Sequence, residues 1–232
     1  MLAALAWLAL APAGQAQQRF VLPEAQKLTF SDCQGCPPMV VLPSGLAISQ
    51  TPVTKAQFAL FVRETNFTQQ DWGCVWGEPE FPQAPNHPVV CVSWNDAAAF
   101  AAWLATKSGK PYRLPTLDEM RYAAAGGESS PYWWGQDVGT GRANCRQCGS
   151  KWDGKGTAPA ATFKPNRYGV SDAVGNVWVW TTTCHGSACN ERMLFGGAWS
   201  SPPSDLRATR SIWNEIGLRF NTYGFRVVID AS

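Results

Sequence analysis

The eight cysteines of this chain are the residues whose spacing most directly suggests chemistry. Six of them fall in close pairs, two of which have C-x-x-C spacing: Cys33 with Cys36, Cys145 with Cys148, and Cys184 with Cys189. Cys74 and Cys91 would then pair by elimination, although eight cysteines allow many connectivities. Four thiolates from the two C-x-x-C motifs could instead bind zinc tetrahedrally. Neither motif opens a helix that would lower a thiol pKa, which argues against a redox-active dithiol.

Oxygen donors suggest a second candidate site. Asn144 and Asp153 flank a short loop that contains a glycine. An amide oxygen and a carboxylate, together with nearby backbone carbonyls, are the donors that a hard cation such as calcium prefers. A plain Asn/Asp turn explains the same residues without a metal, so the residues alone leave both interpretations open.

Groups for acid–base catalysis are few. The two histidines, His87 and His185, lie in no recognisable Ser/His/Asp or metal-binding arrangement. Charged residues gather near the C-terminus, where they could serve an acid–base enzyme or form a solvated rim: Asp205, Arg207, Arg210 and Glu215.

The N-terminal segment predicts export. Residues 1–16 are apolar and uncharged and end in the small-x-small pattern Gly14-Gln-Ala16, as a signal peptide does, although a basic n-region is missing and a misassigned start codon is the alternative. Pro12 and Gly14 interrupt a run that is too short to span a membrane. Export to the periplasm or the medium suits an even number of cysteines and favours disulfides over zinc.

The rest of the chain is predicted to form one domain. Residues 17–29 are interpreted as an N-terminal extension and 30–232 as the domain, because no linker divides them. A formal net charge of +2 gives no electrostatic footprint for nucleic acid. After removal of the leader we expect no membrane span.

Local patterns predict the elements that position these residues. Three capping boxes, which begin at Thr54, Ser93 and Thr116, predict helices that end near Thr65, Lys107 and Ala125. The apolar run 38–43 predicts a strand, and 47–49 continues it as a hairpin. After Gly127 the absence of a helical period predicts loops and short strands.

An ordered series of phrases carries a family resemblance. Gly169–Trp180, Gly196–Trp199 and Gly224–Val228 follow upstream phrases such as His87–Trp94 and Tyr112–Thr116. The series resembles the family of the formylglycine-generating enzyme, also called sulfatase-modifying factor, from Phe30 to Val228. The resemblance implies an α+β fold related to C-type lectins, loop-rich with little regular secondary structure.

The resemblance also implies calcium. It implies a structural ion held by two side chains and two backbone carbonyls, which match Asn144, Asp153, Cys145 and Lys155. A second family site is matched by Asp172, Gly175 and Val177. Position 179 is valine where the family has glutamate, and the loss of one carboxylate weakens that site, so we expect one ion.

Oxidising members of the family hold copper on two cysteines just after the Gly-Gly phrase. Here Ser200–Pro203 follows Gly196–Trp199, and no cysteine lies between Asn190 and Ser232. A hydroxyl such as that of Ser201 is a poor ligand for copper(I), and chain order argues against Cys184 and Cys189 as a substitute, so copper is not expected. The loop nevertheless contains candidates for catalysis: Trp199, Ser201, Asp205 and Arg207.

The leading hypothesis is therefore a binding protein of this family. We expect residues 199–223 to bind a peptide, protein or small molecule through loop aromatic, amide and arginine side chains: Trp199, Arg210, Trp213, Asn214 and Tyr223. One alternative is an oxidative maturation enzyme, for a protein or a siderophore, that uses other residues; another is a lectin-like display protein. Arg226 and Trp178 are expected to support the core.

Overall fold

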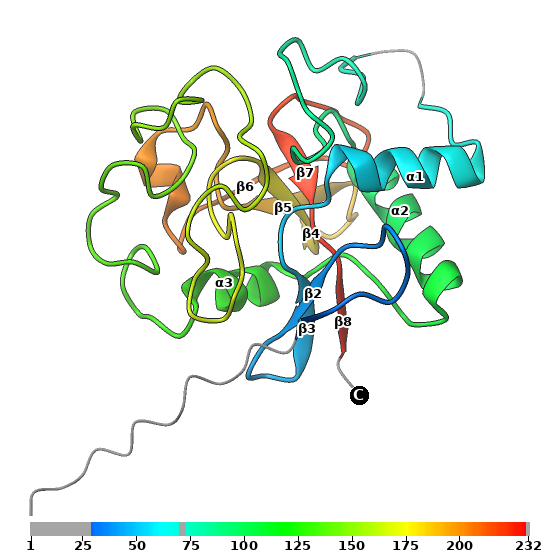
Figure 1. Ribbon diagram of the computed structural model, residues 1–232, viewed down its shortest axis with the longest axis horizontal. Helices are drawn as coiled ribbons and strands as arrows, with labels where there is room; N and C mark the ends of the chain where they lie inside the picture. Colours follow the sequence, from blue (N-terminus) through cyan, green and yellow to red (C-terminus); the bar gives the residue numbers. More distant parts are fainter. Residues whose placement is uncertain (1–28, 70–72, 231–232) are drawn as a thin grey trace, which may run out of the picture.

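The computed structural model describes residues 29–69 and 73–230, which form two four-stranded sheets, three α-helices and a short 3-10 helix (Figure 1). The predicted leader and nearly all of the predicted extension lie outside these residues. The first sheet has the order β1 (Thr29–Phe30), β2 (Met39–Val41), β3 (Leu46–Ser49) and β8 (Val228–Asp230). The second has the order β6 (Ser211–Glu215), β5 (Glu191–Phe195), β4 (Trp178–His185) and β7 (Tyr223–Phe225). Helices and short strands linked by long loops confirm the α+β prediction.

The three predicted helices are confirmed as α1 (Lys55–Thr65), α2 (Trp94–Ser108) and α3 (Leu117–Ala125). Each begins with a complete capping box, in which the N-cap side chain and the side chain three residues later each accept a backbone N–H. A cap of this kind contributes about 1 kcal/mol because it satisfies donors that the first turn leaves free. Each helix ends at a residue in the left-handed conformation: Asn66, Gly109 and Gly126.

Both sheets separate two hydrophobic cores, because successive strand residues point to opposite faces. On β4, Trp178 and Trp180 face the core that contains α1 and α2, whereas Val179 faces the core that contains α3. Strands β2, β3, β5 and β8 alternate between the same two cores. Figure 1 shows α1 and α2 on one side of the strands and α3 on the other.

All eight cysteines form disulfides, in the three predicted close pairs Cys33–Cys36, Cys145–Cys148 and Cys184–Cys189 and in the pair predicted by elimination, Cys74–Cys91. Their Cα atoms lie 4.8–5.2 Å apart, within the usual range for a disulfide. Each C-x-x-C motif therefore closes on itself, and the zinc alternative is wrong. Within the described ranges, no helix combines the length and the apolar character that crossing a bilayer requires.

Arg226 joins the two sheets from inside the protein. The residue follows β7, has no exposed surface, and its guanidinium donates to the carbonyl oxygens of Ser49 (2.8 Å), Asp172 (2.7 Å) and Ser171. Burial lowers the pKa of Arg226 to about 10, against the attraction of Asp172, so the side chain stays charged at neutral pH. The predicted role of Arg226 in the core, forked onto loop carbonyls, is confirmed.

Replacing Arg226 by lysine is expected to destabilise the fold by about 3 kcal/mol or more, because one ammonium cannot reach three carbonyls and leaves buried acceptors without donors. Urea unfolding followed by circular dichroism measures the change. The matched control is Arg207→Lys on the surface, for which we expect a change within about 0.5 kcal/mol. A loss below about 1 kcal/mol in Arg226→Lys would contradict the role assigned to the fork.

Candidate functional site

The predicted ligand loop, 199–223, begins at a tight turn that depends on glycine. Gly196 and Gly197 have φ values of 101° and 77°, which other residues rarely adopt. A Cβ atom on Gly197 would lie 2.7 Å from Cδ1 of Leu206 in the 3-10 helix (Pro203–Leu206). The turn therefore packs directly against the segment that follows it.

Ser201 and Trp199 use their polar atoms within this turn. The Ser201 hydroxyl accepts the backbone N–H of Ala198 at 3.0 Å, and Ser201 is only 7% exposed. The indole N–H of Trp199 donates to the carbonyl of Asn221 at 3.0 Å, and its ring packs edge-on against Phe81. Both side chains thus hold the loop in place.

The charged residues of the loop lie at its rim. Asp205 and Arg210 form an ion pair with an Oδ1–Nη2 distance of 3.6 Å, and the Arg210 side chain is 56% exposed. Arg207 is also exposed. Exposed pairs of this length contribute little stability, which leaves both arginines free to contact a ligand.

Trp213 and Asn214, two of the predicted ligand residues, are neighbours on strand β6 and lie on opposite faces of the sheet. Asn214 donates to the Tyr223 hydroxyl at 2.9 Å, and Tyr223 is buried, which raises its pKa. Trp213 lies on the other face, is 48% exposed and stacks on His185 with ring centroids 4.4 Å apart. The structure therefore brings Asn214 and Tyr223 together and separates them from Trp213.

The Trp213 face continues across three strands. His185, Glu191 and Glu215 are register partners on β4, β5 and β6 and therefore share one face of the sheet. A cavity of about 640 Å³ lies beside them and is also lined by the 186–190 loop. The adjoining Cys184–Cys189 disulfide closes that loop. This cavity could not be predicted from the sequence, because strand pairing creates it.

A buried ion pair fixes the other end of the ligand loop. Arg219 binds the carboxylate of Asp96 in a bidentate manner, at 2.7 and 2.9 Å, and both side chains are at least nine-tenths buried. The same carboxylate accepts the backbone N–H of Ser93 in the capping box of α2. From the sequence Asp96 was recognisable only as a capping residue, since its partner lies far along the chain.

The candidate calcium residues meet in one loop. Ser150 links them, because its hydroxyl donates to Oδ1 of Asn144 at 2.8 Å and its carbonyl accepts the N–H of Asp153. Asp153 also accepts the N–H groups of Gln147 and Gly149. The candidate donors are all hard oxygens, the type that calcium binds, and those of the Asn144 and Asp153 side chains each accept a hydrogen bond within the loop. In the described residues no group of three or more His, Cys, Asp or Glu side chains could hold a metal.

The second candidate calcium site is buried. Asp172 accepts the N–H of Ala161 at 2.9 Å, and its backbone carbonyl accepts a hydrogen bond from Arg226. Burial raises the pKa of Asp172 to about 6. Gly175 and Val177 lie in the same buried turn, where the Val177 N–H donates to the Gly175 carbonyl. These contacts give Asp172 a turn-closing role without a metal.

Comparisons with known proteins agree with this geometry. Residues 7–231 match the family model described as Sulfatase-modifying factor enzyme 1-like domain. The chain is 42% identical over 127 residues to a formylglycine-generating enzyme of Thermomonospora curvata, covering 47% of this chain and 39% of that one. It is 35% identical over 182 residues to the inactive C-alpha-formylglycine-generating enzyme 2 of Bos taurus, covering 68% and 56%. It thus spans less than two thirds of these curated relatives.

A solved structure extends the comparison to nearly the whole fold. The structure of PvdO from Pseudomonas aeruginosa superposes with a TM-score of 0.78 at 27% sequence identity. The match covers 88% of this chain and 98% of that one.

Proposed function

Because the chain belongs to the sulfatase-modifying factor enzyme 1-like domain family, we propose that it is an exported member that binds a peptide, protein or small-molecule ligand. The ligand contacts residues 199–223. The protein does not oxidise cysteine on a two-cysteine copper site.

This proposal rests on one observation: the structure has no free thiol in the described residues, and a hydrogen-bonded serine lies in the turn after Gly197. Copper(I) prefers soft thiolate ligands. All eight cysteines are joined in disulfides. Ser201 lies near the first family cysteine position, and its hydroxyl accepts a backbone hydrogen bond that closes the turn. This arrangement supports a domain that keeps the family fold for recognition.

The face around Trp213 suits a ligand better than the face around Asn214. An aromatic ring that is half exposed, stacked on His185 and next to a cavity of about 640 Å³ offers a rigid apolar contact. Asn214 and Tyr223 already bond to each other, so their role is to hold β6 in position. Trp213 and the exposed Arg210 are the ligand contacts in this proposal.

An enzyme is the second candidate function. The identity to formylglycine-generating enzymes and the match to 98% of the PvdO chain favour it. Catalysis would then use residues other than a copper thiolate pair, and the half-buried Asp205 and the exposed Arg207 are the candidates within the loop.

Export rests on two observations. Four disulfides require an oxidising compartment, so the periplasm or the medium is the proposed location. The apolar segment 1–16 supplies the export signal in this proposal.

Replacing Trp213 by alanine is expected to weaken ligand binding about tenfold or more, because the change removes the exposed ring that anchors the ligand. The probe is a random peptide library displayed on phage and selected against the full chain. Affinities of the enriched peptides for the two proteins are then compared by biolayer interferometry.

The matched control is Val75→Ala, which shortens a side chain that is 42% exposed on the loop between α1 and α2. This variant should bind the peptides as the unchanged protein does. Peptides that bind Trp213→Ala and the unchanged protein equally well would contradict the proposed surface. A selection that enriches no peptide would contradict the peptide form of the proposal.

We further propose one structural calcium ion, held by the side chains of Asn144 and Asp153 and by the carbonyls of Cys145 and Lys155. The support is a donor set made of oxygens that the fold gathers into one loop. With a single carboxylate the site is weak, because calcium affinity rises with the number of charged ligands. The second site, at Asp172, Gly175 and Val177, stays empty in this proposal.

Removal of calcium by a chelator is expected to lower the melting temperature. Saturation at 100 times Kd stabilises a fold by about 2.7 kcal/mol, and each kcal/mol corresponds to roughly 2–4 °C for a domain of this size. The Asp153→Asn variant should lose the response to calcium, whereas Asp137→Asn, at an exposed position, should keep it. Differential scanning fluorimetry measures the shift, and calorimetric titration that gave zero or two ions per chain would contradict the proposal.

A further inference from the structure

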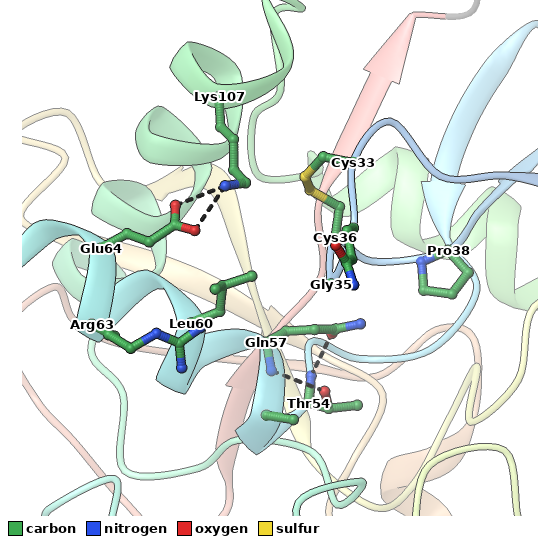
Figure 2. Close-up of a pocket in the computed structure, with 12 residues that line it drawn as sticks. Cys33, Gly35, Cys36, Pro38, Thr54, Gln57, Leu60, Arg63, Glu64 and Lys107 are labelled. Atoms are coloured by element: carbon green, nitrogen blue, oxygen red, sulfur yellow. Dashed lines mark hydrogen bonds and ion pairs between the residues drawn. A yellow bond between two sulfur atoms is a disulfide. The ribbon is translucent and has the colours of Figure 1, made fainter.

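The Cys33–Cys36 disulfide lies in the wall of a cavity of about 790 Å³, far along the sequence from the ligand loop (Figure 2). The turn that carries the disulfide forms one wall, with Gly35 and Pro38. Helix α1 forms the other wall with Leu60 and Glu64, and Lys107 of α2 reaches in to pair with Glu64 at 2.8 Å. The Cys33–Cys36 disulfide therefore faces a space that a small molecule or a peptide segment can enter.

The two sulfur-bearing residues differ in accessibility. Both cysteines line the cavity, but Cys33 is half-buried whereas Cys36 is only 5% exposed. Attack on a disulfide requires access to one sulfur along the S–S axis, with the other sulfur leaving. The geometry favours Cys33 as the attacked atom and Cys36 as the leaving group.

A second motif of the same spacing provides an internal comparison. Cys145 and Cys148 are 0% and 1% exposed, so no external thiol reaches them in the folded protein. In the Cys74–Cys91 pair, Cys91 is fully buried and Cys74 is half-buried, so burial alone does not set the first motif apart. The two C-x-x-C motifs have the same spacing, but only Cys33–Cys36 of the two lines an open cavity.

The disulfide is not the only bond that holds its turn. The bond closes a loop with a sequence separation of 3, which removes little entropy from the unfolded chain. Other bonds hold the turn: Asp32 accepts hydrogen bonds from Lys110 at 2.6 Å and from Tyr112 at 2.5 Å, and the Cys36 N–H donates to the Cys33 carbonyl at 3.1 Å. The turn therefore keeps its shape when the bond opens.

The charge of the cavity suits an anionic nucleophile. Its lining contains two cations, Arg63 and Lys107, and one anion, Glu64, which is bonded to Lys107. Arg63 on the exposed surface of α1 is then the cation available to an incoming group. An excess of positive charge raises the local concentration of thiolate and of acidic thiol compounds.

The disulfide lines a cavity, Cys33 is more exposed than Cys36, and the lining carries an excess of positive charge. We therefore propose that Cys33–Cys36 is a thiol–disulfide exchange site for the thiolate of a peptide cysteine or an acidic low-molecular-weight thiol. The disulfide is the oxidant, so the reaction needs no low thiol pKa in this chain. The proposal concerns a different surface from residues 199–223 and does not rest on the proposed function.

The exchange proceeds in two balanced steps. In the first, the incoming thiolate forms a bond with Sγ of Cys33, the Cys33–Cys36 bond breaks, and Cys36 leaves as a thiolate that takes a proton from water. In the second, another thiolate attacks the incoming sulfur and Cys33 leaves. Two external thiols become one disulfide, and the protein pair gains two electrons and two protons.

The test uses the full, folded chain and reduced glutathione, an anionic thiol, as the probe. Samples are alkylated at successive times, and mass spectrometry assigns the state of each cysteine. We expect Cys33–Cys36 to open at least ~10 times faster than Cys145–Cys148, with the glutathione adduct on Cys33. Opening of the two motifs at equal rates, or an adduct on Cys36, would overturn the proposal. Because the measurement needs no variant, it does not depend on the folding of a mutant.

Reversing the charge at Arg63 tests whether the cavity recognises the charge of the thiol or whether the disulfide reacts only because it is exposed. In Arg63→Glu the reaction with glutathione should slow several-fold, and the reaction with cysteamine, a cationic thiol, should accelerate. Arg142→Glu changes an exposed arginine elsewhere and should leave both rates unchanged. Rates in Arg63→Glu that do not depend on the charge of the thiol would contradict recognition by the cavity.

Discussion

The buried guanidinium of Arg226 is the constraint on which the arrangement of the two sheets depends. Strand β8 belongs to the first sheet and β7 to the second, and Arg226 lies on the short link between them. By donating to carbonyls at the end of β3 and in the 171–172 turn, the side chain fixes a loop to both sheets. Burying a charge is costly, and hydrogen bonds from the two terminal nitrogens of the guanidinium to three carbonyls offset that cost only when the loop and the strands take this arrangement.

The long loops depend on side-chain amides in the same way. Asn176 accepts the N–H of Ala158 at 2.8 Å and donates to the Ala158 carbonyl at 3.1 Å, which imitates a strand pairing. Asn144 donates to the Gly156 carbonyl and to Asn176. Buried backbone groups that no strand satisfies thus find partners on asparagine. This scaffold holds the 144–153 loop and the turn after Gly197 at fixed positions, which is what a recognition surface needs.

Local rules predicted much of this fold. The capping boxes at Thr54, Ser93 and Thr116 predicted three helices whose observed ends agree within a residue or two, because caps act over a few residues. Close spacing likewise predicted three of the disulfides, and elimination predicted Cys74–Cys91. The parallel pairing of β4 with β7 and the opposite directions of Trp213 and Asn214 could not be predicted, because they depend on register between distant strands. The Asp96–Arg219 pair and the cavity beside Cys33 could not be predicted either, because each joins segments that are far apart in the chain.

The proposal that this protein keeps the family fold without a copper thiolate pair can be tested with one assay. The full chain, loaded with copper(I), is incubated with a cysteine-containing peptide while oxygen uptake and the mass of the peptide are followed. The account predicts no uptake beyond that of copper in buffer and no formylglycine in the peptide. Formylglycine that appears only when the protein is present would contradict it.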